Sequence, residues 1–394
     1  MGMRAGQSTG KPGADRRQDH GRRNAIARNV LLKTAPYMRK YLGAFTGALA
    51  GNTRIKLFNV GLLTSIDLRV TMNYTIATAI GTLSGKGPHA AIQRIKLVDF
   101  DGSDRINISG FHLFLRNAVR NRDGGFGLNM LGTGNVITDP NVPTAIAANT
   151  GSFQLTVPVC ANYDEKDLRG MMLMQTAVGE VYLSIDWASS LYTNSNDDFV
   201  FNGGATSAFS ATSFTVEAWQ NYHLPQAQSG GVQLPQQDLL TVYELAGMVR
   251  STTDFAANTE KLVNLPNVRE VLGGYHTYLH NSIFPSSAND CNRFRLIANG
   301  NNVMQDHSDN SLYWTNRKAF NGDISPYPSG TLSAAPRGVY LFDFKRQPIR
   351  TWLYGNVQQG FTPQTAPSGT TSLESTFESV YGKGTVLPGL GQAQ

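Results

Sequence analysis

Residues 62–76 read LLTSIDLRVTMNYTI, and apolar side chains occupy every even position of this stretch except Thr64. Polar side chains occupy the odd positions from Ser65 to Thr75. Successive side chains of a strand point to opposite faces, so a period of two marks a strand with one buried face. The stretch therefore predicts a long strand that lies on a hydrophobic core.

The same alternation recurs along the whole chain, at residues 153–159, 181–187, 214–218, 294–298, 338–344 and 349–355. Loops rich in Gly, Asn, Ser and Pro separate these stretches. Strands without intervening helices favour an antiparallel all-β sandwich or barrel over a βαβ protein. GGVQLPQQDL, at 230–239, is the expected junction between two β-rich halves, each long enough for eight strands. The predicted organisation is an N-terminal arm at 1–48, a first half at 49–233 and a second half at 234–394.

Two stretches are predicted to be helical. Asn24 can cap a short helix that runs through Ile26, Val30 and Leu31, and Pro36 would end or kink this helix. The second is NVREVLGGYHTYLHNSIF, at 267–284, where apolar side chains recur near helical spacing despite a Gly-Gly pair.

The charge of the chain is concentrated at its start. The chain has 34 Lys and Arg against 28 Asp and Glu, a formal net charge of +6. Residues 1–40 carry ten of the basic and two of the acidic side chains, which leaves 24 basic and 26 acidic in the rest. A basic arm on a nearly neutral body indicates a tether to phosphate, either of nucleic acid or of lipid headgroups.

Motifs that carry catalytic or metal chemistry are weak. HTYLH places His276 and His280 at helical i, i+4 spacing, but Thr277 stands where a zinc protease has Glu, so two buried or interface histidines are the alternative. DFDGSD, at 99–104, gathers Asp99, Asp101 and Asp104 without the spacing of a calcium loop, and a hairpin turn explains it better. An incidental cation at these aspartates stays open. We predict no catalytic residue, cofactor or dedicated metal site, and therefore no enzyme.

Four segments, at 110–121, 157–170, 234–245 and 338–357, resemble in order and spacing the major capsid protein of tectiviruses, which are tail-less icosahedral bacteriophages with a lipid membrane beneath the shell. The likeness runs from about Ile26 to Tyr381. It is most specific in the last segment, GVYLFDFKRQPIRTWLYGNV. The resemblance implies two consecutive eight-stranded jelly rolls, with a short N-terminal helix and a helix in a second-roll loop. It also implies that three copies form a pseudo-hexagonal capsomer of an icosahedral shell.

The resemblance also implies the partners and the location of the chain. It would assemble in the host cytoplasm and lie in the virion, in contact with itself, the inner viral membrane, and penton and minor capsid or membrane proteins. Its N-terminal arm would face the membrane, which would separate it from packaged nucleic acid. The membrane-facing residues expected on this basis are Arg16, Arg17, Arg22, Arg23, Arg28 and Lys33; a solvated leader is the simpler alternative.

Two other classes of function share the predicted strands. A carbohydrate- or receptor-binding viral β-sandwich, such as a spike or lectin, would not need the basic arm. An enzyme of the cupin type would need clustered metal-binding histidines. The seven histidines are scattered along the sequence, with only His276 and His280 paired, which disfavours the cupin hypothesis.

Overall fold

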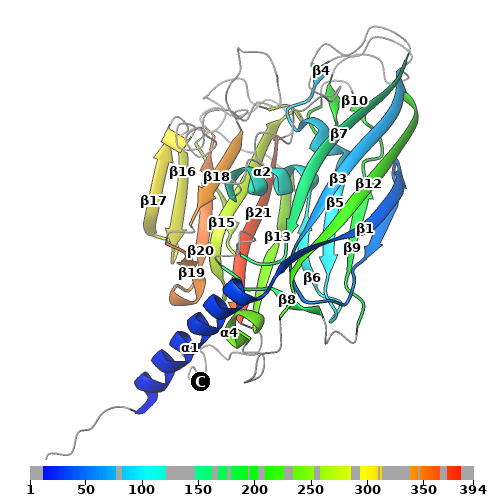
Figure 1. Ribbon diagram of the computed structural model, residues 1–394. Coiled ribbons are helices and arrows are strands. Elements are labelled where there is room, and N and C mark those ends of the chain that lie inside the picture. The colour runs from blue at the N-terminus through cyan, green and yellow to red at the C-terminus, as the bar shows by residue number, and fades with distance from the viewer. Residues whose placement is uncertain are drawn as a thin grey trace, which may run out of the picture.

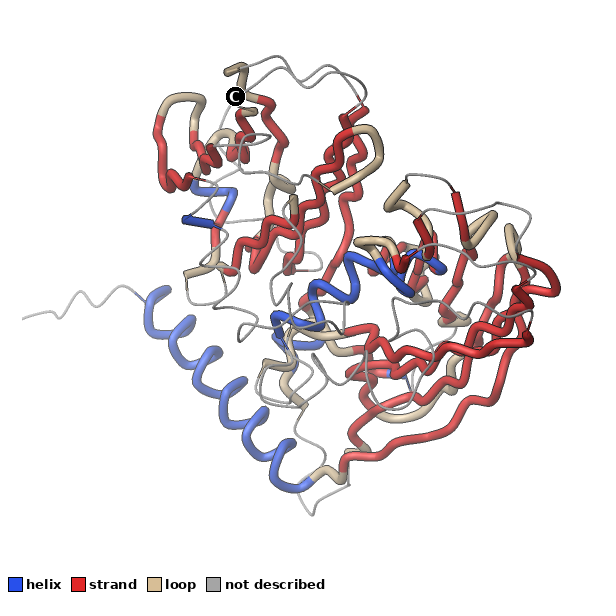
Figure 2. Tube along the Cα trace, turned by 90° about the horizontal axis from the view of Figure 1, so that it is seen from above, coloured by secondary structure: helices blue, strands red, loops and turns tan. Residues whose placement is uncertain are grey.

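Two β-sandwiches lie side by side in the computed structural model of the chain (Figure 1). The structure describes residues 12–76, 82–120, 147–161, 167–174, 179–193, 196–202, 209–225, 234–252, 258–284, 293–308, 311–312, 338–344, 347–363 and 371–382. Viewed from above, the two groups of strands stand apart, with helices at their periphery and between them (Figure 2).

The first sandwich has two four-stranded faces in the described part of the chain. One has the strand order β1-β12-β3-β7 (Tyr37–Ala48, Phe209–His223, Leu62–Ile76 and Ala147–Pro158), and β8 (Met172–Leu173) also pairs with β3. The other has the order β6-β5-β9-β2 (Asp104–Ile108, Ile92–Val98, Tyr182–Trp187 and Asn52–Lys56). A small sheet of β10, β11 and β4 (Tyr192–Thr193, Phe201–Asn202 and Thr82–Leu83) lies at its upper end (Figure 1).

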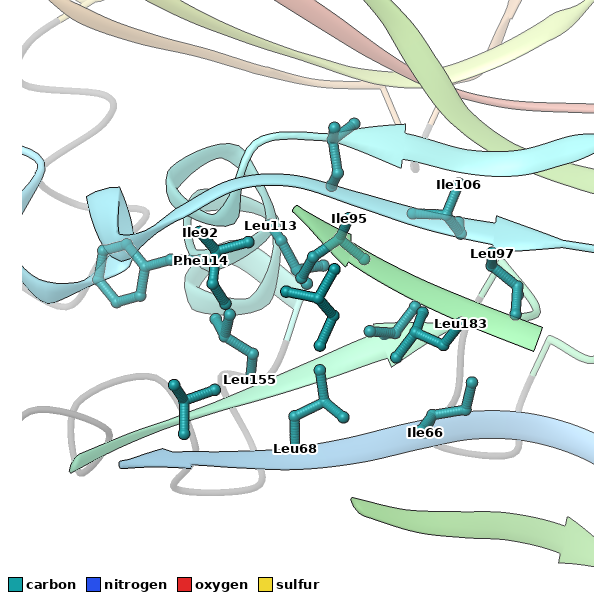
Figure 3. Packing of buried hydrophobic residues seen from close by; sticks show 14 of the residues in the cluster. Ile66, Leu68, Ile92, Ile95, Leu97, Ile106, Leu113, Phe114, Leu155 and Leu183 are labelled. Atoms are coloured by element: carbon teal, nitrogen blue, oxygen red, sulfur yellow. The ribbon is translucent and has the colours of Figure 1, made fainter. Parts of the chain in front are cut away.

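The core of the first sandwich follows from the alternation that predicted it. Ile66 and Leu68 of β3 face Leu97 of β5 and Leu183 of β9 across the sandwich (Figure 3), and all four side chains are buried. Of the outward side chains of β3, Arg69 is exposed, and those of Asp67, Thr71, Asn73 and Thr75 are half-buried. The strand predicted at 62–76 is confirmed residue for residue.

The second sandwich repeats this plan. One face has the order β18-β15-β21-β13 (Val339–Asp343, Glu270–His280, Thr371–Gly382 and Thr241–Thr252), and β19 (Ile349–Arg350) also pairs with β15. The other has the order β14-β20-β16-β17 (Lys261–Asn264, Val357–Thr362, Arg293–Ala298 and Asn302–Ser308). Phe294, Phe361 and Phe377 are in its buried core. The expected pair of eight-stranded rolls is thus confirmed among the described residues.

A single sheet joins the two rolls. Leu245 of β13 pairs in parallel with Ile106 of β6, which makes one nine-stranded sheet from both rolls. The two rolls therefore share backbone hydrogen bonds as well as side-chain contacts.

The N-terminal helix is longer than the sequence predicted. Helix α1 spans Pro12–Thr34, so Asn24 lies within it and does not cap its start. Proline is favoured at a first helical position, because its missing N–H would have no partner there. The predicted end before Pro36 is confirmed. The chain continues directly into β1, so the range 1–48 holds a helix and an edge strand.

The predicted helix at 267–284 is wrong, because this stretch forms strand β15. Nine of its eleven residues, from Val271 to Leu279, are buried. A strand that is buried on both faces has apolar side chains on both, so its period of two disappears from the sequence. The strand predicted at 349–355 is also mostly wrong: after β19 the chain forms a 3-10 turn, η5 (Thr351–Leu353).

Helix α2 (Gly110–Arg120) was missed by the sequence analysis. The Ser109 hydroxyl accepts a hydrogen bond from the His112 N–H at 3.3 Å, as an N-cap residue does. Phe111, Phe114 and Leu115 recur at helical spacing and are buried. Two shorter helices complete the described elements, η1 (Gly87–Ala91) and α4 (Gln236–Leu239).

The turn at 99–104 is the predicted hairpin between β5 and β6. Asp99 Oδ1 accepts the backbone N–H of Asp101 at 2.9 Å and of Ser103 at 3.2 Å, and Arg105 Nε donates to Oδ2 at 3.0 Å. Gly102 takes the positive φ of +79° that this turn needs. The carboxylate of Asp99 therefore stabilises the turn itself.

Candidate functional site: the N-terminal helix and the junction of the rolls

The predicted membrane-facing residues all lie on α1. Arg22, Arg23 and Lys33 are exposed, while Arg28 is half-buried. Arg16 and Arg17 lie within the same helix, but their side chains are outside the described part of the structure. In Figure 1 the start of α1 extends away from the strands and its end reaches the base of the molecule.

Arg28 anchors α1 to the segment that connects the rolls. Its Nε and Nη2 donate to the two carboxylate oxygens of Asp238, at 2.6 and 2.5 Å, and Asn24 Nδ2 donates to Oδ1 at 3.1 Å. Asp238 lies on α4 and is buried. The hydrogen bond to Asp238 raises the pKa of Arg28, so this guanidinium stays charged at any ordinary pH. Arg28 therefore attaches α1 to the body, and we leave it out of the membrane-facing residues that we propose below.

An apolar contact supports the same anchor. Leu31 and Ala35, at the end of α1, pack in one cluster with Leu62, Cys160, Leu168 and Met171. Burial of this face gives the last turns of α1 the stability that an isolated polar helix lacks. The helix is therefore fixed at its end, while the preceding turns carry exposed positive charge.

A buried ion network joins the two rolls above this base. Glu378 on β21 accepts hydrogen bonds from Arg120 Nε at 2.9 Å and Nη2 at 2.6 Å, and from Arg116 Nη2 at 3.3 Å. The hydroxyls of Tyr243 and Tyr275 donate to it at 2.9 and 2.8 Å. Burial alone would raise the pKa of Glu378, but Arg120 and Arg116 lower it to about 2. Helix α2 of the first roll is thus bound to the sheet of the second through one carboxylate.

A second network crosses the same junction. Lys86 Nζ lies 2.6 Å from Asp198 Oδ1 and 3.1 Å from Glu374 Oε2 on β21. The nearby ring of His112 hydrogen-bonds to the hydroxyls of Thr376 at 2.7 Å and Thr277 at 2.8 Å. A cavity of about 410 Å³ adjoins Lys86, Asp198 and Glu374. Neither network was predictable from the sequence, because its charged residues look there like ordinary surface residues.

The predicted histidine pair does not form a site. His276 is buried in β15, where its Nδ1 lies 2.8 Å from Ser375 Oγ. His280 ends the same strand, four residues and therefore about 13 Å away. Among the residues that the structure describes, no group of three His, Cys, Asp or Glu side chains could hold a metal.

No helix in the described ranges is long and apolar enough to cross a membrane.

Comparison with known proteins agrees with this architecture. Residues 38–225 match the family described as P3 major capsid protein N-terminal. The chain is 27% identical to the major capsid protein P3 of Enterobacteria phage PRD1, across 77% of this chain and 76% of that protein.

Solved structures share the fold. The major capsid protein of Sulfolobus turreted icosahedral virus superposes with a TM-score of 0.61 at 13% identity, across 88% of this chain and 97% of that one. The capsid structure of virus PBCV-1 has a TM-score of 0.53 at 13% identity, across 88% and 94%. The family match, the phage relative and the shared fold together indicate a double jelly-roll major capsid protein similar to P3 of PRD1, a component of a virion shell and not an enzyme.

Proposed function

We propose that the chain forms trimeric, pseudo-hexagonal capsomers that tile an icosahedral shell over an internal lipid membrane. The two rolls would occupy 49–233 and 234–394, and three copies would present six similar rolls to their neighbours. The similarity to P3 and the two-roll fold support this assembly. The further partners that we propose are neighbouring capsomers, pentons and minor capsid or membrane proteins. We expect no direct contact of the chain with packaged nucleic acid.

The arrangement of α1 supports the proposed contact of the chain with the membrane. Arg22, Arg23 and Lys33 are exposed on a helix whose end is fixed to the body by Arg28 and Asp238. A helix of 23 residues is about 34 Å long, so its charged turns can reach well beyond the rolls. Each basic side chain near an anionic surface contributes about 1 kcal/mol. Three arms on one capsomer would act together and increase the avidity further.

Binding to vesicles tests the role of the arm. We expect that deletion of residues 1–23, which keeps Asn24 and Arg28, weakens binding to anionic vesicles at low salt, and that rising salt removes the difference. The triple substitution R22Q, R23Q and K33Q should weaken binding in the same direction, because it removes three of the charges without shortening the helix. Co-flotation with the vesicles measures both. Equal binding by the full chain and both variants would refute the membrane tether.

A further inference from the structure

Five large apolar side chains are exposed at the end of the molecule where α1 is anchored. We call them the base patch: Phe58, Phe100, Leu240, Val268 and Leu353, exposed by 41, 39, 58, 42 and 63%. All five lie in turns or connections, outside the strands. They are distant from one another in sequence, so their shared location depends on the strand register.

The register brings the two residues of the first roll to this end. Leu62 begins β3 opposite Leu173, and Leu62 also belongs to the cluster that holds α1. Phe58 lies in the short connection from Lys56, at the end of β2, to Leu62. Tyr182 pairs with both Lys56 and Val98, so the hairpin that carries Phe100 is at the same end.

The three residues of the second roll lie at the matching end. β13 runs parallel to β6, which starts just after the Phe100 hairpin, so both strands start at the base. Leu240 directly precedes Thr241, the first residue of β13, which pairs with Gly382. Val268 precedes the pair of Glu270 with Val380. Leu353 follows β19, whose Arg350 pairs with Glu270.

The backbone at Val268 is strained. Val268 has a φ of +57°, in the left-handed region that β-branched residues rarely adopt. Glycine or asparagine would relieve this strain, yet the chain has an exposed valine. Exposure of an apolar side chain to water does not offset the backbone strain. A partner that covers Val268 would explain why a valine stands at this position.

Basic and aromatic side chains lie beside the residues of the base patch. Lys40 Nζ lies 3.7 Å from the centre of the Phe58 ring, and the Arg269 guanidinium lies 3.5 Å from that of Tyr381. Trp352 and Tyr381 line a cavity of about 210 Å³ beside Val268. Aromatic rings and long basic side chains beside apolar residues are typical of the water–lipid interface.

We propose that the base patch inserts among lipid headgroups and gives the rolls a direct contact with the membrane that does not depend on the charge of α1. This inference rests on the proposed function, because it takes the same membrane as its partner. Separate apolar turn tips suit a deformable lipid layer, whereas a protein interface needs one continuous, complementary face. The two contacts differ in kind: that of α1 is electrostatic and weakened by salt, whereas that of the patch is apolar.

The test uses the full chain and uncharged, zwitterionic phosphatidylcholine vesicles at about 1 M salt, where the Debye length is about 3 Å and the arm contributes little. We expect measurable partitioning onto these vesicles, and the double substitution L240S and L353S should lower it about tenfold. The matched control is I283S. Ile283 is 37% exposed and follows His280, at the opposite end of β15 from Glu270. The control should bind like the parent, and circular dichroism should show that both variants are folded.

The outcomes separate this inference from the proposed function. If the full chain binds anionic vesicles at low salt but shows no partitioning onto zwitterionic vesicles, the arm is supported and the base patch is refuted. Partitioning that L240S and L353S leave unchanged also refutes the patch. If the chain binds neither kind of vesicle, both proposals fail.

Discussion

At the scale of single residues, Glu378 connects the two rolls through one buried carboxylate. Its buried carboxylate accepts from Arg116 and Arg120 of the first roll and from Tyr243 and Tyr275 of the second. Removal of one partner from a buried ion pair leaves an uncompensated charge, which is far more costly than the loss of an exposed pair.

We therefore predict that E378Q lowers the free energy of unfolding by about 3–5 kcal/mol. The matched control is E180Q, because Glu180 forms an ion pair with Lys56 on the surface, where solvent screens the charges and the pair contributes little to stability. Denaturant unfolding followed by tryptophan fluorescence measures both. Similar losses in the two variants would show that the Glu378 network does not hold the rolls together.

The pH dependence of stability should show two steps. Burial lowers the pKa of His276 from 6.5 to about 3, so between these values the unfolded chain binds a proton that the folded chain excludes, and stability falls as pH drops below about 6.5. The pKa of Glu378 is lowered from 4.5 to about 2, so its contribution is complete above about 4.5 and is lost toward pH 2. Unfolding midpoints from pH 8 to 3 test this. Constant stability from pH 6.5 to 4 would contradict it.

At the scale of elements, α1 is a helix that is fixed to the body at its C-terminal end. Asp238 binds the helix through Arg28 and Asn24, and Leu31 and Ala35 pack in an apolar cluster of the body. The turns before Asn24 have no comparable apolar face in the sequence, so the anchor decides how the arm leaves the body.

We predict that D238N loosens the end of α1 while the rolls stay folded. Neutral asparagine loses the charge-assisted hydrogen bonds to Arg28, so amide hydrogen exchange across residues 24–34 should speed up by at least about tenfold. R23Q is the matched control, because it removes an exposed charge from the same helix and should leave exchange unchanged. Unaltered exchange in D238N would mean that apolar packing alone fixes the helix.

Strands with one solvent-exposed face were predictable from the sequence, and the strand that is buried on both faces was not. The strand at 62–76 alternates because its outer side chains meet water, whereas β15 lies between β18 and β21 with both faces covered and was mistaken for a helix. α2 was missed, although Ser109 and the spacing of Phe111, Phe114 and Leu115 could have indicated it.

The basic arm of the candidate site was predictable from the sequence, but the ion pairs that connect it to the body were not. The charge asymmetry identified the basic arm, but Asp238 lies 210 residues from Arg28, and a pairing over that distance leaves no local pattern. The same holds for Glu378 and its arginines on α2.

At the scale of the whole molecule, two similar rolls joined by one nine-stranded sheet form a unit that can present nearly equivalent sides to its neighbours. In the proposed capsomer, rigidity across the junction would serve tiling, because bending between the rolls would change the angles at which copies meet. The buried ion pairs of Glu378 and Glu374 connect the two rolls and would resist such bending.

The mass of the purified protein in solution tests the central claim most directly. A capsomer requires three copies of the 42.9 kDa chain, so light scattering should give three times that mass, unchanged on dilution. A stable monomer or dimer would contradict the account, because two rolls per chain tile a pseudo-hexagonal lattice only as a trimer.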